Sequence, residues 1–152
     1  MFDPQILNKT LAWCQTAVPK PTPRNEQTAL GVHFEEVAEM VSALKGNDRL
    51  TQSLLTAALV SLHSLALHLK ASEVNKISVV DTTELLDALA DQIVTAVGVA
   101  HMNRYDILGA VDEVNRSNWS KFVDGQAIFD ANQKIVKGPH YSKPNLRQFV
   151  PH

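Results

Sequence analysis

The chain has 152 residues, 45% of them hydrophobic and 20% charged, which predicts one soluble globular domain. Its formal net charge of −2 disfavours a nucleic acid polymer as partner, because proteins that bind such polyanions are usually basic. Cys14 is the single cysteine, which excludes an intrachain disulfide and a zinc cluster built on several thiolates. A reducing, cytoplasmic setting is expected.

The chain offers no clear signal for export or for a membrane partner. The N-terminal stretch MFDPQILNKT lacks the charged-then-apolar pattern of a signal peptide. No run approaches the roughly 18 uninterrupted apolar residues of a membrane span. The longest candidate, residues 54–69, is interrupted by Ser61, His63, Ser64 and His68.

The N-terminal part of the chain predicts two helices separated by a linker. Asp3 and Pro4 have the pattern of an N-cap followed by proline, which predicts a first helix to about Thr16. Residues 19–24, PKPTPR, predict an extended linker. With Asn25 as its expected cap, the second helix runs from Glu26 to about Leu44 along one apolar stripe formed by Leu30, Phe34, Val37, Val41 and Leu44.

Three more helices are predicted before residue 119. The third spans about 49–70 and has a long seam of apolar residues at Leu50, Leu54, Ala58, Leu62, Leu65 and Leu69. The fourth begins with the capping-box pattern DTTE at Asp81 and runs to about Asn103. The fifth, capped by Asp106, runs to about Asn118. Cys14 is expected to be a core residue of the first helix.

The segment after Phe122 has a different character. Asp124 and Gly125 form a turn signal, and the stretches AIFD and KIVKG predict two short strands. The expected fold is therefore all-α, a single domain over residues 1–152. It consists of a bundle of about five helices, an N-terminal helix and linker in 1–24, and a small β-hairpin or irregular tail in 123–152.

Three glutamates gather in the second predicted helix, in the stretch EEVAE. At about 100° per residue, Glu35 and Glu39 lie about 40° apart, and Glu36 lies about 60° from Glu39 on the other side. The three carboxylates project from one flank, where each like-charge pair costs an isolated helix about 0.2–0.5 kcal/mol.

A second acidic flank is predicted on the fourth helix, where Asp87 and Asp91 are four residues apart. If the two helices pack together, the flanks can face each other, and so many carboxylates would need a cation. Oxygen ligands favour Mg²⁺, with Mn²⁺ as the alternative, and no Glu-x-x-His pair of a helical di-iron site occurs. The expected metal ligands are Glu35, Glu36, Glu39, Asp87 and Asp91. A solvated surface is the simpler interpretation of such residues, and a capping box alone explains Glu84.

The order of these motifs resembles the all-α nucleoside triphosphate pyrophosphatases, the relatives of MazG and of phosphoribosyl-ATP pyrophosphohydrolase. Residues 35–39 are similar to the family's EExxE signature, and residues 84–101 to its second acidic helix. AVDEVNRSNWSKF, residues 110–122, resembles the closing helix, and residues 134–146 resemble the tail that follows. The resemblance spans roughly residues 25–146.

The second acidic motif departs from the family's ExxD pattern. Glu84 and Asp87 fit that pattern literally, but the apolar run that follows it in the family comes after Asp91 here. Asp87 and Asp91 are therefore the favoured ligands, and Glu84 stays open. The two acidic motifs are also further apart than in compact family members, because the third helix is long.

The resemblance implies hydrolysis of a nucleoside triphosphate between the α and β phosphates, which gives a monophosphate and pyrophosphate. Bound Mg²⁺ would neutralise phosphate charge and lower the pKa of a water, whose proton Glu35 or Glu36 would accept. Asn115, Asn118 and Lys121 are the implied nucleotide contacts, because amides can bind a base edge or a sugar hydroxyl and lysine can bind phosphate.

Family members form dimers, so the resemblance implies a homodimer or a dimer of dimers, and the long leucine seam of the third helix fits this. Two other classes stay open: a non-catalytic helical module whose acidic flanks bind a partner, and a metal-binding bundle. The residues leave open the preferred base and sugar, and whether the nucleotide is canonical or modified.

Overall fold

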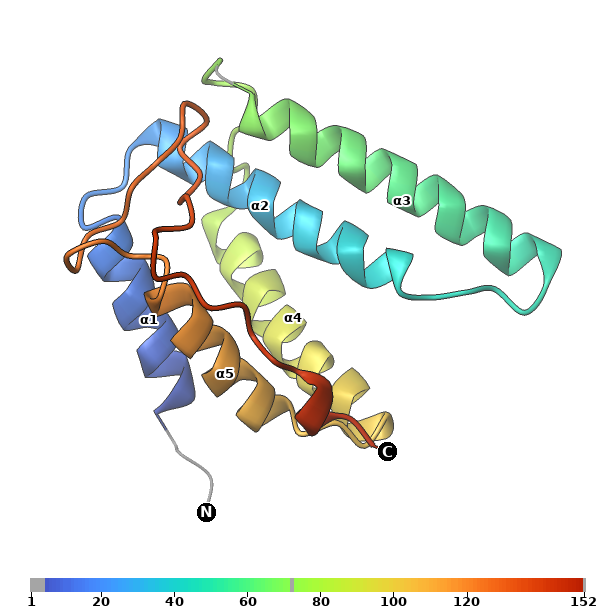
Figure 1. The fold of residues 1–152 in the computed structure, drawn as a ribbon. Helices are drawn as coiled ribbons and strands as arrows, with labels where there is room; N and C mark the ends of the chain where they lie inside the picture. The colour runs from blue at the N-terminus through green and yellow to red at the C-terminus, as the bar shows by residue number, and fades with distance from the viewer. Residues whose placement is uncertain (1–4, 72, 152) are drawn as a thin grey trace. The chain divides into compact units, whose positions relative to one another are not determined.

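The computed structural model of the protein describes residues 5–71 and 73–151, and the chain forms two compact units. The first unit comprises Met1–Pro19, Val79–Ile128 and Ile135–His152, and the second comprises Lys20–Ser78 and Phe129–Lys134. The described residues form five α-helices and no named strand, which confirms the all-α class (Figure 1). The single domain expected from chain length is thus organised as two units.

The second unit is built from α2, Pro23–Ser42, and α3, Arg49–Lys70, which lie side by side in opposite directions (Figure 1). Thr22 caps α2 in a capping box with Asn25, so the expected cap at Asn25 is wrong by one turn. Pro23 begins the helix because a proline lacks only an N–H that would be unpaired there. The predicted bounds of α3 are confirmed, with Asp48 accepting a hydrogen bond from the Thr51 N–H at 2.8 Å.

Helices α2 and α3 approach each other closely at small residues. Gly31, Ala38 and Ala66 are all buried at this contact. A Cβ atom at Gly31 would lie 2.9 Å from Lys70 Cγ and 3.1 Å from the Ala66 carbonyl oxygen. The absence of a side chain at Gly31 is therefore what allows the C-terminal turns of α3 to pack against α2.

The C-terminal end of α3 is capped by side chains from α2. Gln27 is buried, and its Nε2 donates to the carbonyls of Leu69 at 2.9 Å and Glu73 at 2.8 Å. Its Oε1 accepts a hydrogen bond from the Lys76 N–H at 2.9 Å. The Arg24 guanidinium donates to the carbonyls of Lys70 and Ala71. These bonds satisfy carbonyls that have no partner inside the helix, and they fix where α3 ends.

The first unit contains α1, Ile6–Ala17, α4, Thr82–Met102, and α5, Ile107–Trp119, with α5 contacting both other helices. The aromatic ring of Trp13 stacks on that of Phe122 with 5.9 Å between centroids, and Phe122 is buried. The expected N-caps of α4 and α5 are confirmed, because Asp81 and Asp106 each accept backbone N–H bonds. The cap predicted at Asp3 and Pro4 lies outside the described residues.

Cys14 is exposed, so its expected place in the core is wrong. The buried positions of α1 are Ile6 and Ala17, and Trp13 provides the aromatic contact to Phe122. Cys14 follows Trp13 by one residue and is therefore rotated about 100° around the helix, away from that contact.

The C-terminal segment turns back on itself without forming the two predicted strands. Asp124 and Gly125 have φ of 51° and 75°, and the bridge between Val123 and Gln126 confirms the predicted turn. Further along, Val136 N–H donates to the Ile128 carbonyl at 2.8 Å, which leaves a very short pairing. The next N–H along the chain that could extend it, that of Gly138, donates instead to the Lys121 carbonyl at 3.1 Å. A 3₁₀ turn, Arg147–Phe149, follows.

Helices α3 and α4 leave much apolar surface exposed. Both are long and apolar enough to cross a membrane by length and composition, and little of either is buried. A core helix of a soluble protein passes the same length and composition test, so this finding is weak evidence by itself. The large apolar side chains of α3 that are exposed are those of Leu50, Leu54, Val60, Leu65 and Leu67.

A leucine at Gly31 is expected to destabilise the protein by about 1–3 kcal/mol, because it overpacks the contact between α2 and α3. The same substitution at Gly98 is the matched control, since a Cβ there meets nothing within 4 Å. Gly98→Leu should stabilise the protein by about 0.5–1 kcal/mol through helix propensity. Urea unfolding followed by circular dichroism measures both changes, and equal effects would contradict the close approach at Gly31.

Candidate functional site

The Glu35 carboxylate of α2 is held between two lysine ammonium groups. Lys70 Nζ lies 2.6 Å from Glu35 Oε1, and Lys134 Nζ lies 3.3 Å from Glu35 Oε2. Lys70 is the last residue of α3, whereas Lys134 belongs to Phe129–Lys134, the part of the C-terminal segment in the second unit. The side chains of Glu35 and Lys70 are only 18% and 13% exposed, so their charges are partly shielded from water.

The two lysines set the protonation of Glu35. Burial raises the pKa of this carboxyl, but the hydrogen bonds and charges of Lys70 and Lys134 together outweigh burial and lower the pKa below its usual value. Glu35 therefore stays ionised at neutral pH and is a weaker proton acceptor than an ordinary glutamate.

A cavity of about 450 Å³ lies beside this ion pair, and both lysines line it. Its other walls come from Leu67 and Ala71 at the end of α3 and from Asp130 and Asn132 of the C-terminal segment. Asp130 Oδ1 accepts hydrogen bonds from the backbone N–H groups of Asn132 at 2.8 Å and Lys134 at 3.0 Å. These bonds fix the turn that places Lys134 over Glu35.

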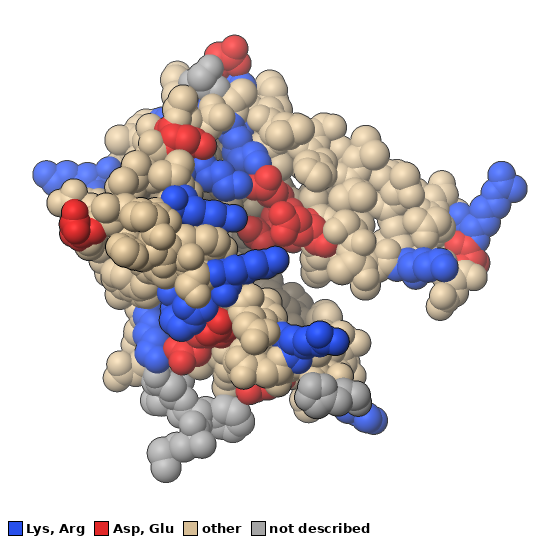
Figure 2. Space-filling view, viewed as in Figure 1, with Lys and Arg blue, Asp and Glu red and all other residues tan. Residues whose placement is uncertain are grey.

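The other two glutamates of the EExxE stretch, Glu36 and Glu39, are exposed on α2. Asp and Glu residues, drawn red in Figure 2, gather over the middle of this helix. Among the residues that the structure describes, no three His, Cys, Asp or Glu side chains are grouped so as to hold a metal ion. Within α2, Glu35 is directed toward the two lysines, whereas Glu36 and Glu39 are exposed. The three carboxylates therefore do not converge on one point.

The second predicted acidic flank is exposed on α4, which belongs to the first unit. Asp87 and Asp91 are both exposed there. The Glu84 N–H donates to Asp81 Oδ1 at 3.0 Å, so Glu84 occupies the N3 position of the helix cap. The oxygen donors of Glu36, Glu39, Asp87 and Asp91 fit a hard cation such as Mg²⁺ by their chemistry.

Asn115, one of the predicted nucleotide contacts, links α5 to α1. It is buried, and its Oδ1 accepts a hydrogen bond from Thr10 Oγ1 at 2.9 Å. Its Nδ2 donates to the Ile6 carbonyl at 3.4 Å. The Asn115 amide is therefore already engaged in holding two helices together, and a nucleotide contact through it would replace these bonds.

Asn118 and Lys121, the other two predicted contacts, bond to each other. Lys121 Nζ donates to Asn118 Oδ1 at 2.7 Å and lies 5.8 Å from the centroid of the Trp13 ring. Both side chains are half-buried at the C-terminal end of α5. The structure thus brings these two residues together at one place on the first unit, consistent with a shared role.

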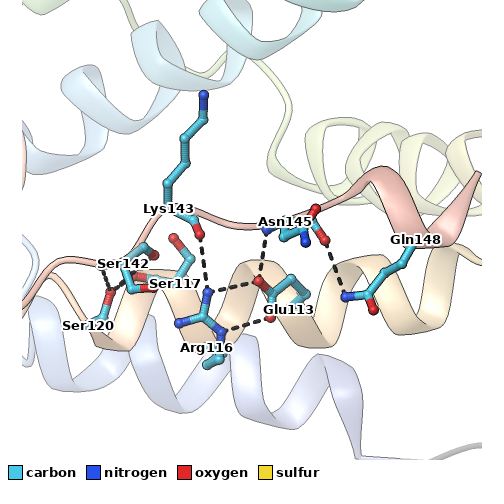
Figure 3. Close-up of polar contacts among 8 residues, drawn as sticks. All are labelled: Glu113, Arg116, Ser117, Ser120, Ser142, Lys143, Asn145 and Gln148. Atoms are coloured by element: carbon cyan, nitrogen blue, oxygen red, sulfur yellow. Dashed lines mark hydrogen bonds and ion pairs between the residues drawn. The ribbon is translucent and has the colours of Figure 1, made fainter.

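The C-terminal tail is strapped along α5 by polar contacts (Figure 3). The Asn145 N–H donates to Glu113 Oε1 at 2.9 Å, and Arg116 forms two bonds with Glu113 at 2.7 and 2.8 Å. Near the other end, the Ser142 N–H donates to Ser120 Oγ at 2.9 Å. These contacts hold residues 142–145 against the helix that carries Asn118.

Sequence reasoning missed Lys70 and Lys134 as members of the site. Lys70 and Lys134 lie 35 and 99 positions from Glu35, so no motif spacing connects the three residues. The capping role of Gln27 was missed for the same reason, since it depends on where α3 ends. A charged residue in the last turn of a long apolar helix was the only local signal.

Compared with models of known families, with curated proteins and with solved structures, the chain matches none. The residues of the two units therefore provide the basis for a functional proposal.

The pKa of the Glu113 carboxyl is lowered to about 2 by the Arg116 side chain and by the Asn145 N–H. Because the folded pKa lies below the usual value, Glu113 stabilises the strapped tail above about pH 4.5 and loses this effect as pH falls toward 2. NMR titration of the Glu113 carboxyl carbon measures this pKa. Arg116→Met should move the pKa toward 4.5, the usual value for glutamate. Titration of the wild-type carboxyl near the usual value would contradict the strap.

Proposed function

We propose that the protein is a Mg²⁺-dependent nucleoside triphosphate pyrophosphohydrolase that cleaves between the α and β phosphates. The observation that supports this most directly is the contact of Glu35, in the EExxE stretch, with Lys70 and Lys134, which line a cavity. Carboxylates can hold a hard cation, and ammonium groups can hold phosphate oxygens. A metal–polyphosphate substrate needs both kinds of group close together.

The exposed carboxylates are the proposed metal ligands, with Glu36 and Glu39 from α2 and with Asp87 and Asp91 retained from the sequence pattern of α4. When bound, Mg²⁺ supplies phosphate charge neutralisation and a water of lowered pKa. Glu35 and Glu36 remain the two candidate bases, and the lysines, which lower the pKa of Glu35, make Glu35 the weaker proton acceptor while it is paired with them. As a metal ligand, Glu35 must first be released from its lysines.

Asn118 and Lys121 are the proposed nucleotide contacts of the first unit. The lysine already donates to the amide oxygen, so the Asn118 Nδ2 group keeps its donors for a base edge or a sugar hydroxyl. Asn115 is proposed only as the residue that positions α5, because its amide holds α1.

Glu36→Gln is expected to reduce Mg²⁺-dependent release of pyrophosphate from nucleoside triphosphates by about 10²–10⁴-fold, because a candidate base is removed. Asp91→Asn should also cause a large loss, because the proposed metal site loses a charge. Glu26→Gln is the matched control, since Glu26 is exposed in the first turn of the same helix. A panel of canonical and modified nucleotides with pyrophosphate detection makes the measurement.

If the wild-type protein releases no pyrophosphate from any nucleotide, and Mg²⁺ does not shift its melting temperature, the enzyme proposal is wrong. A non-catalytic module that binds a partner through its acidic flanks would then be the better explanation. A melting shift with Mg²⁺ but without turnover would instead favour a metal-binding bundle.

The exposed apolar side of α3 supports a homodimer as the working form. Figure 2 shows its surface as mostly uncharged, with Arg49 and Lys70 as the only charged residues of the helix. Leu50, Leu54 and Leu67 are each more than half exposed, whereas a soluble monomer rarely leaves so large an apolar patch uncovered. A second copy of the chain is the partner that the resemblance implies.

Leu54→Glu is expected to convert the dimer to a monomer, because a charge would be buried in the apolar contact. Leu7→Glu is the matched control, since Leu7 is equally exposed but lies on α1. Light scattering after size-exclusion chromatography measures the mass of each variant. A wild-type monomer would contradict the dimer, and dissociation by both variants would show that α3 has no special role.

A further inference from the structure

We infer that Lys70 and Lys134 form the binding site for the polyphosphate chain of the substrate, and that they exchange Glu35 for phosphate oxygens when the substrate binds. This inference rests on the proposed function, but it concerns residues that the EExxE pattern does not include. The ligand chemistry is a chain of two or three linked phosphates, either on a nucleotide or as the free inorganic anion.

The two ammonium groups already converge on one anionic group. Lys70 Nζ and Lys134 Nζ contact different oxygens of the same carboxylate, at 2.6 and 3.3 Å. An ammonium group has three N–H donors, and the bond to Glu35 uses one of them. Because both lysines also line the cavity of about 450 Å³, the remaining donors are available to an anion that enters it.

The partial burial of Lys70 strengthens the attraction of its charge for an anion. The Lys70 side chain is 13% exposed, so its charge is less screened by water and salt than that of a surface lysine. Lys134 is 52% exposed and forms the longer contact with Glu35. Lys134 is thus the lysine that can move to an incoming phosphate at the lower cost, whereas Lys70, the more buried of the two, exchanges its bond to Glu35 with less movement of its side chain.

Glu35 couples the binding of a metal ion to the binding of the polyphosphate chain. While the lysines neutralise this carboxylate, they are less available to phosphate, and the carboxylate is less available to a cation. A metal ion at Glu35 would release both ammonium groups toward the cavity. Metal and polyphosphate should therefore each strengthen the binding of the other, because such coupling is reciprocal.

The remaining charge at the cavity comes from Asp130, and it is partly compensated. Its Oδ1 accepts two backbone N–H bonds, from Asn132 and Lys134. The Arg24 guanidinium donates to the carbonyls of Lys70 and Ala71 and does not line the cavity. The formal charges of Glu35 and Asp130 cancel those of the two lysines, so strong binding of an anion should require the cation.

Calorimetric titration of inorganic tripolyphosphate into the full chain, with and without Mg²⁺, tests the inference. Lys134→Gln should raise the Kd measured with Mg²⁺ by about ten-fold or more, the usual effect of losing a charge-assisted bond. Lys45→Gln is the matched control, because it removes the same charge from an exposed position of the same unit, and it should change the Kd by less than about two-fold. Equal Kd values for Lys134→Gln and the wild type would overturn the inference, and so would absence of binding to the wild type.

Glu35→Gln provides a readout that a purely structural role of the lysines would not produce. Loss of the carboxylate charge frees both ammonium groups, so tripolyphosphate should bind this variant more tightly than the wild type when Mg²⁺ is absent. Weaker or unchanged binding without Mg²⁺ would contradict the exchange. Circular dichroism of each variant confirms that the fold is retained.

Two further ligands show whether the site binds the phosphate chain of a nucleotide as well as free polyphosphate. They also test the proposed site and the proposed function separately. A nucleoside triphosphate should show the same dependence on Lys134 as tripolyphosphate, whereas a nucleoside monophosphate should bind with little dependence on it. Binding of tripolyphosphate that depends on Lys134, without any nucleotide hydrolysis, would refute the proposed function and support this site. Hydrolysis by the wild type with an unchanged KM in Lys134→Gln would refute the site and leave the function intact.

Discussion

The pairing of Glu35 with Lys70 and Lys134 joins three segments of the second unit: the middle of α2, the end of α3 and the turn at Phe129–Lys134. A partly buried carboxylate is costly unless cations compensate it, and a partly buried ammonium group has the same need. Each of the three side chains therefore depends on the others. Removing the carboxylate would leave two ammonium groups near each other at the edge of the cavity, without the negative charge that they now share.

The backbone around this ion pair is fixed by uncharged contacts. Gly31 allows α3 to approach α2, and Gln27 ends α3 by bonding to the Leu69 carbonyl and to the chain beyond it. Together they place Lys70 at the final position of the helix, within reach of Glu35. Packing and capping thus determine the geometry, and the ion pair determines the electrostatics. A shift of one residue in the register of α3 would rotate Lys70 about 100° around the helix axis, away from the carboxylate.

Local signals in the sequence predicted much of the fold. The bounds of α3 and the caps at Asp81 and Asp106 follow from a polar cap next to an apolar run, which needs no knowledge of tertiary structure. The start of α2 was misplaced because both Thr22 and Asn25 are good capping residues, and only the position of Pro23 decides between them. The site was less predictable, because its lysines come from distant segments. A polar residue such as Asn115 gives no sign in the sequence of whether it faces a ligand or another helix.

The charge arrangement around α2 also shows how three neighbouring glutamates are accommodated on one helix. Two ammonium groups compensate Glu35, while the side chains of Glu36 and Glu39 are exposed, so the electrostatic cost expected from the sequence is reduced within the second unit. The repulsion among the carboxylates is therefore weak evidence for a cation by itself. What favours a functional role is the position of the compensating lysines. Lys70 and Lys134 both line the cavity, so the groups that neutralise Glu35 also face the space proposed for a phosphate chain.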